Sequence, residues 1–394
     1  MPRDPLGYLD AELQGLRDQG LFRSLRVLDG EQTARATVDH RSVVNLSSNN
    51  YLGFTTHPLL RQRAREAINT FGVGSGSVRT IAGTMALHVE LEERLARFKR
   101  TESAIVFQSG FAANAGTVAS LLGREDVIVS DELNHASIID GARLSRATIK
   151  VFPHKDASGA DAIMQALPRT QRALLISDGV FSMDGDLGAL PALADVAESH
   201  GAIMMVDDAH ASGVFGESGR GTVDHFQLHG RVHVQVGTLS KALGALGGYV
   251  AGSRSLIEFL RHRARPFLFS TSHPPSVTAT CIAALDVLEQ EPRWQNQLWA
   301  NTRLLKKGLA ELGFDTGTSE SPITPVIVGD DAKAMRFSDR LFELGTFAQG
   351  IAFPTVPRGK ARVRTIVTAT HTRDELQFAL DVFARVGREL GLIA

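Results

Sequence analysis

The sequence predicts an α/β fold, with a mostly parallel central sheet in a large domain and a smaller α+β domain after it. Short runs that are apolar along their whole length recur between residues 104 and 236, and segments with helical periodicity separate them. Such strands are typical of parallel sheets that helices cover on both faces. Polar residues gather directly after several of these runs, where open α/β sheets bind ligands.

Length and composition are those of an ordinary globular protein. The chain has 394 residues, of which 43% are hydrophobic and 22% charged, enough for two or three structural units. Lys+Arg 42 against Asp+Glu 43 gives a net charge of −1, which argues against a nucleic-acid-binding protein. The N-terminus lacks an apolar signal core and no run reaches membrane-spanning length, so we expect a cytoplasmic protein that binds neither nucleic acid nor membrane.

The single cysteine, Cys281, lies in an apolar run of the sequence. One cysteine cannot form an internal disulfide framework. Its apolar neighbours favour a buried small hydrophobic residue over a catalytic nucleophile.

We expect residues 1–48 to form an N-terminal helix and arm. Leucines recur at helical spacing over 4–22, and short alternating runs over 23–46 indicate a small sheet or an extended arm. The segment 47–53 then combines serines, amides, an aromatic residue and a glycine. It is either an ordinary capped turn or a loop that presents amide groups to a polar ligand.

A large α/β domain is expected over residues 49–288. After a helix at 58–70, the glycine-rich segment 71–80 is either a flexible loop or a ligand-facing one. A second helix is expected at 86–98, and then strands and helices alternate. The predicted strands are 104–107, 127–130, 149–152, 173–177, 203–210 and 232–236.

The first of these strands leads into Ser109-Gly110-Phe111 and then into a helix. Free N–H groups and the helix dipole make such a helix start a natural site for a phosphate. The segment lacks the Gly-Lys-Ser/Thr ending of a nucleotide-triphosphate loop.

The pattern changes after residue 288, and residues 289–394 are expected to form the small α+β domain. The N-terminal segment is a candidate to complete it. The predicted elements are a helix at 304–312, a strand at 325–328, a helix at 331–344, a strand at 361–367 and a final helix at 373–390.

Four residues at strand ends stand out as candidates for chemistry: His135, Asp207, His210 and Lys241. Each has an ordinary interpretation by itself, because a histidine or an aspartate can cap a helix and lysines are mostly exposed. Together they are expected at one rim of one sheet. Their spacing does not fit a metal site, and we find no Gly-x-Ser-x-Gly nucleophile elbow at a strand end.

A pyridine aldehyde cofactor with a phosphate would need all of these groups. A lysine amine binds its aldehyde, as Lys241 could, and a carboxylate such as Asp207 holds the proton on its ring nitrogen. His135 offers a flat ring for stacking, and the loop at Gly110 offers N–H groups to the phosphate. His210 and Ser182 are further groups at strand ends.

Several stretches together resemble one family, the pyridoxal-phosphate-dependent α-oxoamine synthases of aspartate-aminotransferase-like fold (fold type I). The resemblance extends over nearly the whole chain. The matching stretches are 48–53, 134–141, 178–185, 206–210, 238–241 and 265–270.

The resemblance implies a role for each site residue toward pyridoxal 5′-phosphate. Lys241 would bond to the cofactor aldehyde, Asp207 would pair with the ring nitrogen, His210 and Ser182 would approach the ring oxygen, and His135 would stack on the ring. The phosphate would be held by Ser109, Gly110 and Phe111, by Thr238, and by Thr271 or Ser272 of the partner subunit. Asn49 and Arg364 would bind the amino-acid carboxylate, with Arg362 expected on the opposite face of its strand.

Within the family, the chain looks most like glycine C-acetyltransferase (2-amino-3-ketobutyrate CoA ligase). That likeness rests on 20–22, 134–141, 298–301 and 391–394, whereas 109–114 and 270–275 look more like 8-amino-7-oxononanoate synthase. We therefore expect Lys241 to remove the Cα proton of glycine, and the carbanion to attack acetyl-CoA and give 2-amino-3-oxobutyrate and CoA. The alternative is L-alanine with a pimeloyl thioester, with loss of carbon dioxide, or an enzyme that accepts both.

Two other classes stay open at this stage. An aminotransferase of the same fold would keep Lys241 and Asp207 but would not need CoA. In a non-catalytic nucleotide-binding module Lys241 would be incidental. The hydroxyl-rich segment at Thr271 and Ser272, far in sequence from the other phosphate ligands, predicts a homodimer with active sites at the subunit interface.

Overall fold

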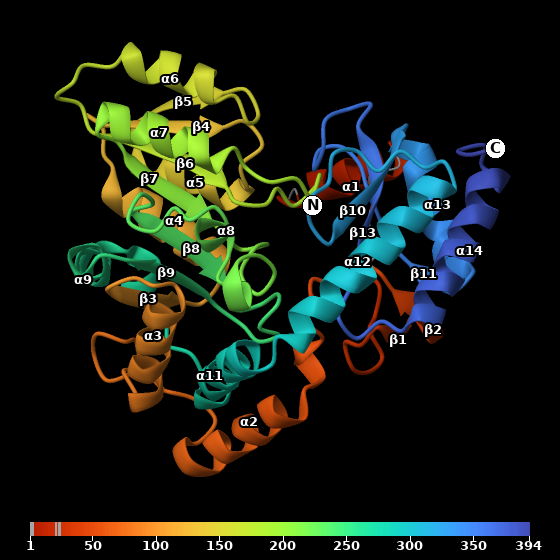
Figure 1. Cartoon of the computed structure of the whole chain (residues 1–394), viewed down its shortest axis with the longest axis horizontal. Coiled ribbons are helices and arrows are strands. Elements are labelled where there is room, and N and C mark those ends of the chain that lie inside the picture. Colours follow the sequence, from red (N-terminus) through yellow and green to blue (C-terminus); the bar gives the residue numbers. More distant parts are fainter. Residues whose placement is uncertain (1–3, 20–21, 23–24) are drawn as a thin grey trace.

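A computed structural model describes residues 4–19, 22 and 25–394 of the chain. Two bodies lie side by side, a larger one around a long sheet and a smaller one built from both ends of the chain (Figure 1). The helix α12 (Arg293–Glu311) runs from the region between the two bodies into the smaller one.

The larger body contains a seven-stranded sheet in the order β3-β9-β8-β7-β6-β4-β5. All neighbours are parallel except β9, which is antiparallel to both β3 and β8. The strands are β3 (Ser103–Phe107), β4 (Val127–Asp131), β5 (Thr148–Phe152), β6 (Ala173–Asp178), β7 (Ile203–Asp207), β8 (Val234–Thr238) and β9 (Gly248–Gly252).

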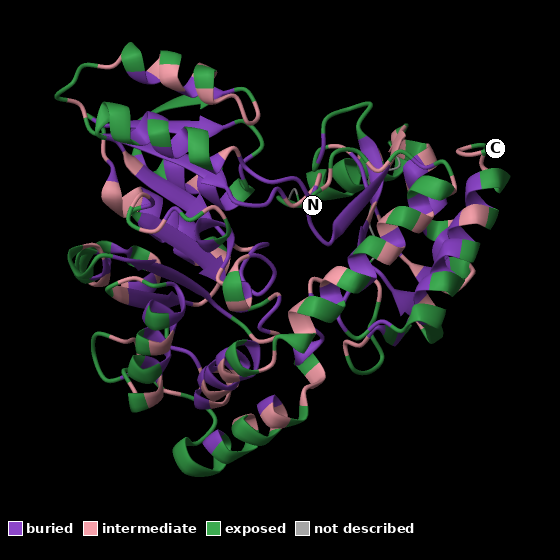
Figure 2. Ribbon diagram, viewed as in Figure 1, coloured by how far each residue is buried: buried purple, intermediate pink, exposed green. Residues whose placement is uncertain are grey.

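Helices cover both faces of this sheet, and the central strands are buried (Figure 2). One face packs against α4 (Gly110–Leu121), α5 (Ala136–Ser145), α9 (Arg254–Arg263) and α10 (Arg265–Leu268). The other packs against α3 (Ala86–Phe98), α6 (Ala157–Gln165), α7 (Leu190–His200), α8 (Thr222–His225) and α11 (Pro275–Gln290), and α2 (Pro58–Phe71) lies against α11.

The smaller body joins N- and C-terminal segments through two three-stranded sheets. β1 (Arg35–Val38) pairs with β2 (Arg41–Asn45), which lies parallel to β11 (Thr346–Phe347). The second sheet has the order β10 (Ile323–Gly329), β13 (Ala361–Ile366) and β12 (Gln349–Ile351). The helices α12, α13 (Asp331–Glu343) and α14 (Arg373–Glu389) cover these sheets.

The predicted α/β class is confirmed, and the elements differ from the predictions mainly at their ends. The sequence analysis missed β9, whose five residues begin and end with glycine and resemble a turn. β8 begins and ends two residues later than predicted. The N-terminal helix α1 (Tyr8–Asp18) is shorter than 4–22, and residues 20 and 21 lie outside the described part of the chain.

The predicted domain boundaries fall close to element ends. Residue 48 follows β2 by three positions, while residue 288 lies inside the last turn of α11. The division at 48/49 and 288/289 stays a prediction. In the described residues, no helix is both long and apolar enough to cross a membrane.

Cys281 is fully buried in α11, as predicted for a small hydrophobic residue. Burial raises the pKa of its thiol to about 12. The thiolate, the form that acts as a nucleophile, is therefore scarce at neutral pH.

Candidate active site

The carboxyl ends of β4, β6, β7 and β8 surround a cavity of about 200 Å³, which we call the lysine cavity. It brings together eight of the predicted site residues, which come from four different strand ends and the loops that follow them. Its lining consists of Ser109, Gly110, Phe111, Asn114, His135, Ser137, Asp178, Val180, Asp207, Ala209, His210, Thr238, Ser240 and Lys241.

The N-terminus of α4 opens into one side of the lysine cavity. Ser109 caps the helix, because its hydroxyl accepts a hydrogen bond of 3.0 Å from the Ala112 N–H. A Cβ at Gly110 would be in ordinary van der Waals contact with Thr238, at 3.4 Å, so Thr238 lies beside the helix start. The hydroxyls of Thr238 and Ser240 lie 2.7 Å apart. Free N–H groups, a helix dipole and three hydroxyls together fit an anion such as a phosphate.

Asp207 ends β7 with its carboxylate in the cavity, and two donors orient it. Asn114 Nδ2 donates to Oδ2 at 2.6 Å, and the Ala209 N–H donates to Oδ1 at 2.8 Å. Asp207 is 5% exposed, so these bonds replace the water that a carboxylate would otherwise bind. Asn114 belongs to the segment 109–114 noted above. Its contact with Asp207 joins residues 93 apart, which the sequence pattern did not predict.

Asp178 is a second carboxyl in the cavity that the sequence analysis did not assign. It ends β6 in register with Asp207 of β7, so the two acids lie side by side. Burial and the neighbouring Asp207 charge raise the pKa of Asp178 well above its usual range. Among the described residues, its Oδ1 atom has no hydrogen-bond partner. The unpartnered Oδ1 of Asp178 is therefore free to make a hydrogen bond with a ligand in the cavity.

Lys241 follows β8 and lines the same cavity. Burial lowers the pKa of its ammonium to about 8, although the Asp207 and Asp178 carboxylates act in the opposite direction. A lysine with this pKa has a much larger neutral fraction at pH 7 to 8 than an exposed lysine. The neutral amine is the form that attacks carbonyls and accepts protons.

Two histidines complete the wall, and both are held neutral. Burial lowers the pKa of His135, and its Nδ1 caps α5 by accepting from the Ser137 N–H at 3.2 Å. Burial and the nearby Lys241 lower the pKa of His210 well below its usual range. The Tyr51 hydroxyl lies 2.7 Å from His210 Nδ1. His135 therefore both caps a helix, which was its ordinary interpretation, and lines the cavity.

Arg364 and Asn49 do not line the lysine cavity. Arg364 Nη1 donates to the Ser182 carbonyl oxygen at 2.9 Å, and its charge lowers the pKa of His210 after burial and Lys241. It also lines a separate cavity of about 760 Å³ together with Ser47 and Ser48. Within the described residues, the buried Asn49 Oδ1 has no hydrogen-bond partner. The assignment of both residues to the substrate carboxylate stays a prediction.

The prediction for Arg362 was wrong. Residues two apart on a strand point to the same face. Arg362 donates to the Met183 carbonyl at 3.0 Å and pairs with Asp184, whereas Arg364 donates to Ser182. The two arginines therefore reach the same loop.

Ser182, Thr271 and Ser272 are predicted cofactor ligands that do not line the lysine cavity. Ser182 lines a neighbouring cavity instead. The Ser272 hydroxyl donates to the Gly83 carbonyl at 2.6 Å, and its oxygen also lies 2.7 Å from Ser75 Oγ, so it closes the glycine-rich loop of its own chain. Their roles toward the cofactor, including those assigned to a partner subunit, stay predictions.

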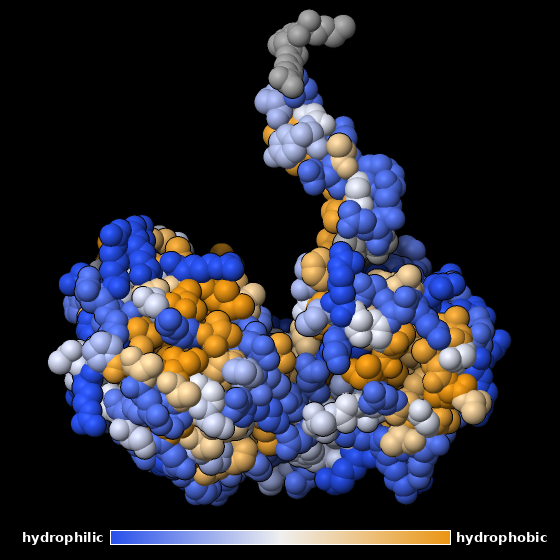
Figure 3. Space-filling view, turned by 90° about the horizontal axis from the view of Figure 1, so that it is seen from above, coloured by the Kyte–Doolittle hydropathy of each residue, from blue (hydrophilic) through white to orange (hydrophobic). Residues whose placement is uncertain are grey.

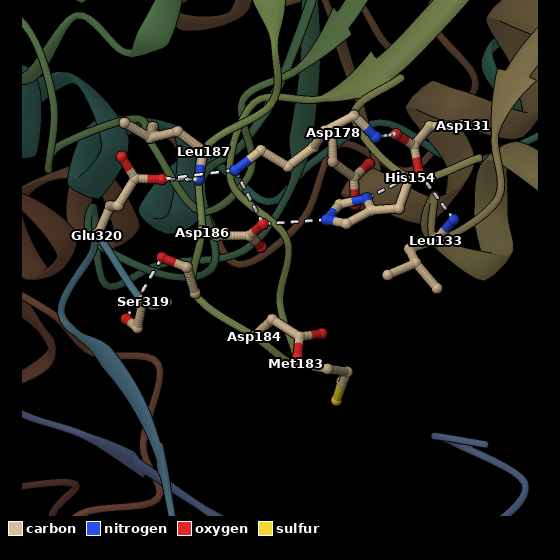
Figure 4. Close-up of polar contacts among 12 residues, drawn as sticks. Asp131, Leu133, His154, Asp178, Met183, Asp184, Asp186, Leu187, Ser319 and Glu320 are labelled. Atoms are coloured by element: carbon tan, nitrogen blue, oxygen red, sulfur yellow. Dashed lines mark hydrogen bonds and ion pairs between the residues drawn. The ribbon is translucent and has the colours of Figure 1, made fainter. Parts of the chain in front are cut away.

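A charged network holds the loop that follows β6 (Figure 4). His154 bridges Asp131 at 3.1 Å and Asp186 at 3.0 Å, and Lys155 Nζ lies 3.1 Å from Asp186 and 3.6 Å from Glu320 of the smaller body. Burial alone would lower the pKa of His154, but the two aspartates raise it to about 9. The network fixes the loop of Ser182 against both bodies.

The lysine cavity fits a phosphorylated pyridine aldehyde. The N-terminus of α4 suits the phosphate, and the neutral ring of His135 suits the face of a planar ring. Asp207 suits a protonated ring nitrogen, and the unpartnered Oδ1 of Asp178 indicates a further polar group that the protein alone does not supply. Lys241 suits the aldehyde.

A family model described as aminotransferase class I and II matches residues 41–383. The chain is 60% identical over 390 residues to the 8-amino-7-oxononanoate synthase of Symbiobacterium thermophilum, covering 98% of this chain and 99% of the relative. It is 54% identical over 386 residues to 8-amino-7-oxononanoate synthase 1 of Bacillus subtilis, covering 98% of each. The chain therefore belongs to the class I and II aminotransferase family and, within it, to the α-oxoamine synthases.

Among solved structures, the serine palmitoyltransferase of S. paucimobilis in a form that holds pyridoxal phosphate matches with a TM-score of 0.94. The identity is 34%, and the match covers 99% of this chain and 100% of the other. The fold is therefore the aspartate-aminotransferase-like fold type I that the resemblance implied.

The comparisons overturn the expected activity of a glycine C-acetyltransferase. Relatives between 51% and 60% identical over 98% of the chain are 8-amino-7-oxononanoate synthases. Segments that favoured glycine C-acetyltransferase differ in their position: 134–141 contributes His135 and Ser137 to the cavity, whereas 298–301 lies away from it. Leu298 is core, and Asn301 donates to the Thr368 and His371 carbonyls. The segment 109–114, which favoured the other activity, lines the cavity itself.

Proposed function

We propose that this chain is a pyridoxal-phosphate-dependent enzyme that condenses L-alanine with a pimeloyl thioester to give 8-amino-7-oxononanoate. The product has nine carbons, an amine on C8 and a ketone on C7. Breaking the C7–C8 bond leaves a seven-carbon acyl group that ends in a carboxylate, and a two-carbon amine that corresponds to alanine without its carboxyl group. The reaction releases one thiol and one carbon dioxide.

The observation that carries this proposal is the 60% identity over 98% of the chain to an enzyme of that name, together with a cavity whose side chains suit the cofactor. Pyridoxal phosphate, when bound, supplies an aldehyde for the amine of the substrate and a ring that takes up the negative charge formed at Cα. Every other task falls to the side chains of the cavity.

Lys241 would hold the cofactor through its amine, and the same amine would accept the Cα proton of the amino acid. Its pKa of about 8 suits a base that works near neutral pH. Asp207, oriented by Asn114 and Ala209, would hold a proton on the ring nitrogen, and His135 would pack against the ring. Arg364 and Asn49 orient the alanine carboxylate, and a guanidinium can hold a carboxylate through two parallel hydrogen bonds.

The proposed reaction is tested with purified, cofactor-loaded protein, L-alanine and pimeloyl-CoA. We expect stoichiometric release of CoA, measured with a thiol reagent, and an amino-oxo acid product identified by mass spectrometry. A holoenzyme that releases no CoA from this pair overturns the proposal. Transamination with a 2-oxo acid in place of CoA release would indicate an aminotransferase.

We also propose that the active form is a homodimer with active sites at the subunit interface. α1 buries none of its residues and projects from the molecule, with Leu9, Leu13 and Leu16 exposed (Figure 3). Thr271 lies outside the cavity of its own chain, as a residue shared with a partner would.

Light scattering tests the assembly, and a mass of twice 42.5 kDa is expected at working concentration. Leu13→Glu should weaken the dimer, whereas Gln14→Glu, one position along the same helix, should not. A monomeric protein with full activity would contradict this part of the proposal.

A further inference from the structure

A second cavity of about 690 Å³, which we call the outer cavity, adjoins the lysine cavity. His135 belongs to the lining of both. The walls of the outer cavity come from the loop after β4, the loop after β6 and the loop between β12 and β13. Its lining consists of Glu132–Ala136, Ile139, Phe181–Asp184, Pro354–Pro357, Lys360 and Arg362.

The outer cavity has the walls that an aliphatic chain requires. Leu133, Ile139, Phe181, Met183 and Val356 contribute apolar surface. The side chains of Leu133 and Met183 both point away from the charged network, toward the same side of the view (Figure 4). Because that network fixes the loop after β6, the wall that carries Met183 is held in place.

Two carboxylates, Glu132 and Asp184, and two cations, Lys360 and Arg362, line the outer cavity. Arg362 is 4% exposed and pairs with Asp184, and the Glu132 carboxylate accepts from the His154 N–H at 2.9 Å. Lys360 is exposed on the loop before β13, and in the described part of the chain its ammonium has no ion-pair partner. The cavity therefore combines apolar walls with an exposed ammonium at Lys360, while the Glu132 carboxylate is held by a backbone N–H.

We propose that the outer cavity holds the acyl chain of the substrate and that Lys360 binds the carboxylate at the far end of that chain. This inference rests on the proposed function, because only a dicarboxylic acyl group places an anion at the far end. The shared wall at His135 lets the thioester carbonyl reach the lysine cavity while the chain extends outward. The cavity at Arg364 is a poorer candidate, since it shares no lining residue with the lysine cavity.

The matched substrates are pimeloyl-CoA and heptanoyl-CoA, which have the same seven carbons and differ only in the terminal carboxylate. Lys360→Gln should lower kcat/KM about fivefold for pimeloyl-CoA and leave kcat/KM for heptanoyl-CoA unchanged. The expected loss is modest because an exposed ion pair contributes little binding energy. Lys360→Glu should lower kcat/KM further for pimeloyl-CoA alone. The loss should shrink as salt is added, since screening weakens exposed charges.

Arg358→Gln is the matched control, because Arg358 lies on the same loop but stacks on Phe353 at 4.5 Å and does not line the cavity. It should leave the ratio of the two kcat/KM values unchanged. An equal loss in Arg358→Gln and Lys360→Gln would show general surface attraction and overturn the assignment of Lys360. An unchanged ratio in Lys360→Gln and Lys360→Glu would overturn it too.

A second pair of variants tests the cavity itself. Ile139→Trp narrows the outer cavity and should raise KM for both acyl-CoA substrates, whereas Leu144→Trp, on the exposed side of α5 and outside the lining, should not. Equal KM values in the two variants would overturn the location of the chain. If the wild type turns over pimeloyl-CoA and alanine but none of these effects appears, this inference fails and the proposed function stands.

Discussion

Lys99 and Lys241 are two enclosed lysines of the larger body, and their surroundings give them opposite properties. Lys99 is 1% exposed, and its Nζ lies 2.9 Å from Asp208 and also donates to the Arg220 carbonyl. Burial alone would lower the pKa of Lys99, but the Asp208 carboxylate raises it. Lys241 lines a cavity without an ion-pair partner among the described residues, and burial lowers its pKa to about 8.

The comparison shows what a direct partner does to a buried amine. With a carboxylate in contact, the charge is retained and the lysine becomes part of the core. Where carboxylates lie near the lysine but do not bond to it, a fraction of the lysine side chains is neutral and reactive. Asp207 and Asp208 are neighbours in sequence, yet one faces the cavity and the other the core pair.

The largest effect is expected from Lys241→Ala. Removing the amine that holds the cofactor and accepts the Cα proton should lower the rate of CoA release by at least about a thousandfold. The free energy of unfolding of the cofactor-free protein should change little, since Lys241 makes no direct ion pair in the described chain. Lys150→Ala, at an exposed position of β5, is the control and should keep full activity. Substantial activity in Lys241→Ala would contradict the assignment.

Lys99→Met should have the opposite profile. It leaves the Asp208 carboxylate buried without its charge partner, and the free energy of unfolding should fall by about 3–5 kcal/mol in urea titrations. The double variant Lys99→Met/Asp208→Asn removes both charges and should recover much of the loss. A single variant as stable as the wild type would show that Lys99 does not hold the core.

The pH dependence of cofactor capture tests the lowered pKa directly. Because the neutral amine attacks the aldehyde, the rate at which stripped enzyme recaptures pyridoxal phosphate should rise with pH and level off above about pH 8. Absorbance follows the reaction. Nα-acetyl-lysine is the control, and the rate of its reaction with pyridoxal phosphate should keep rising until about pH 10, near the pKa of an ordinary lysine. If the rate for the enzyme also kept rising to about pH 10, the pKa of Lys241 would not be lowered.

The smallest effect concerns His154, which resembles Lys99 in having carboxylate partners. Its folded-state pKa of about 9 lies above the ordinary value of 6.5, so its stabilising contribution is complete below about pH 6.5 and is lost as pH rises through 9. The stability difference between wild type and His154→Gln should therefore be larger at pH 6 than at pH 9.5. His262→Gln, at an exposed position of α9, should show no such trend.

Much of the lysine cavity was predictable because its residues end parallel strands. Lys241, Asp207, His210 and His135 each follow an apolar run, and the ends of parallel strands meet at one edge of a sheet. Tyr51 was not predictable in the same way, since its contact with His210 joins residues 159 apart and depends on how the two bodies meet.

Two errors have physical causes. β9 was missed because a short antiparallel strand with glycine at both ends has the composition of a turn. The acyl group was misassigned because the matches conflict even at the cavity, where 134–141 favours one activity and 109–114 the other. Further matches such as Asn301, which donates to backbone carbonyls, do not contact the cavity. Substrate choice depends on the few side chains that line a site, and the sequence alone does not show which ones do.

Because Asp207 and Asp208 have different partners, shortening β7 and lengthening it would have different consequences. Deleting one residue within β7 would move Asp208 into the place of Asp207, so the cavity would keep a carboxylate while Lys99 would lose its partner. Inserting one residue would move Asp207 into the place of Asp208, so the core pair would survive and the cavity would receive Val206 instead. Shortening the strand thus threatens folding, and lengthening it threatens catalysis.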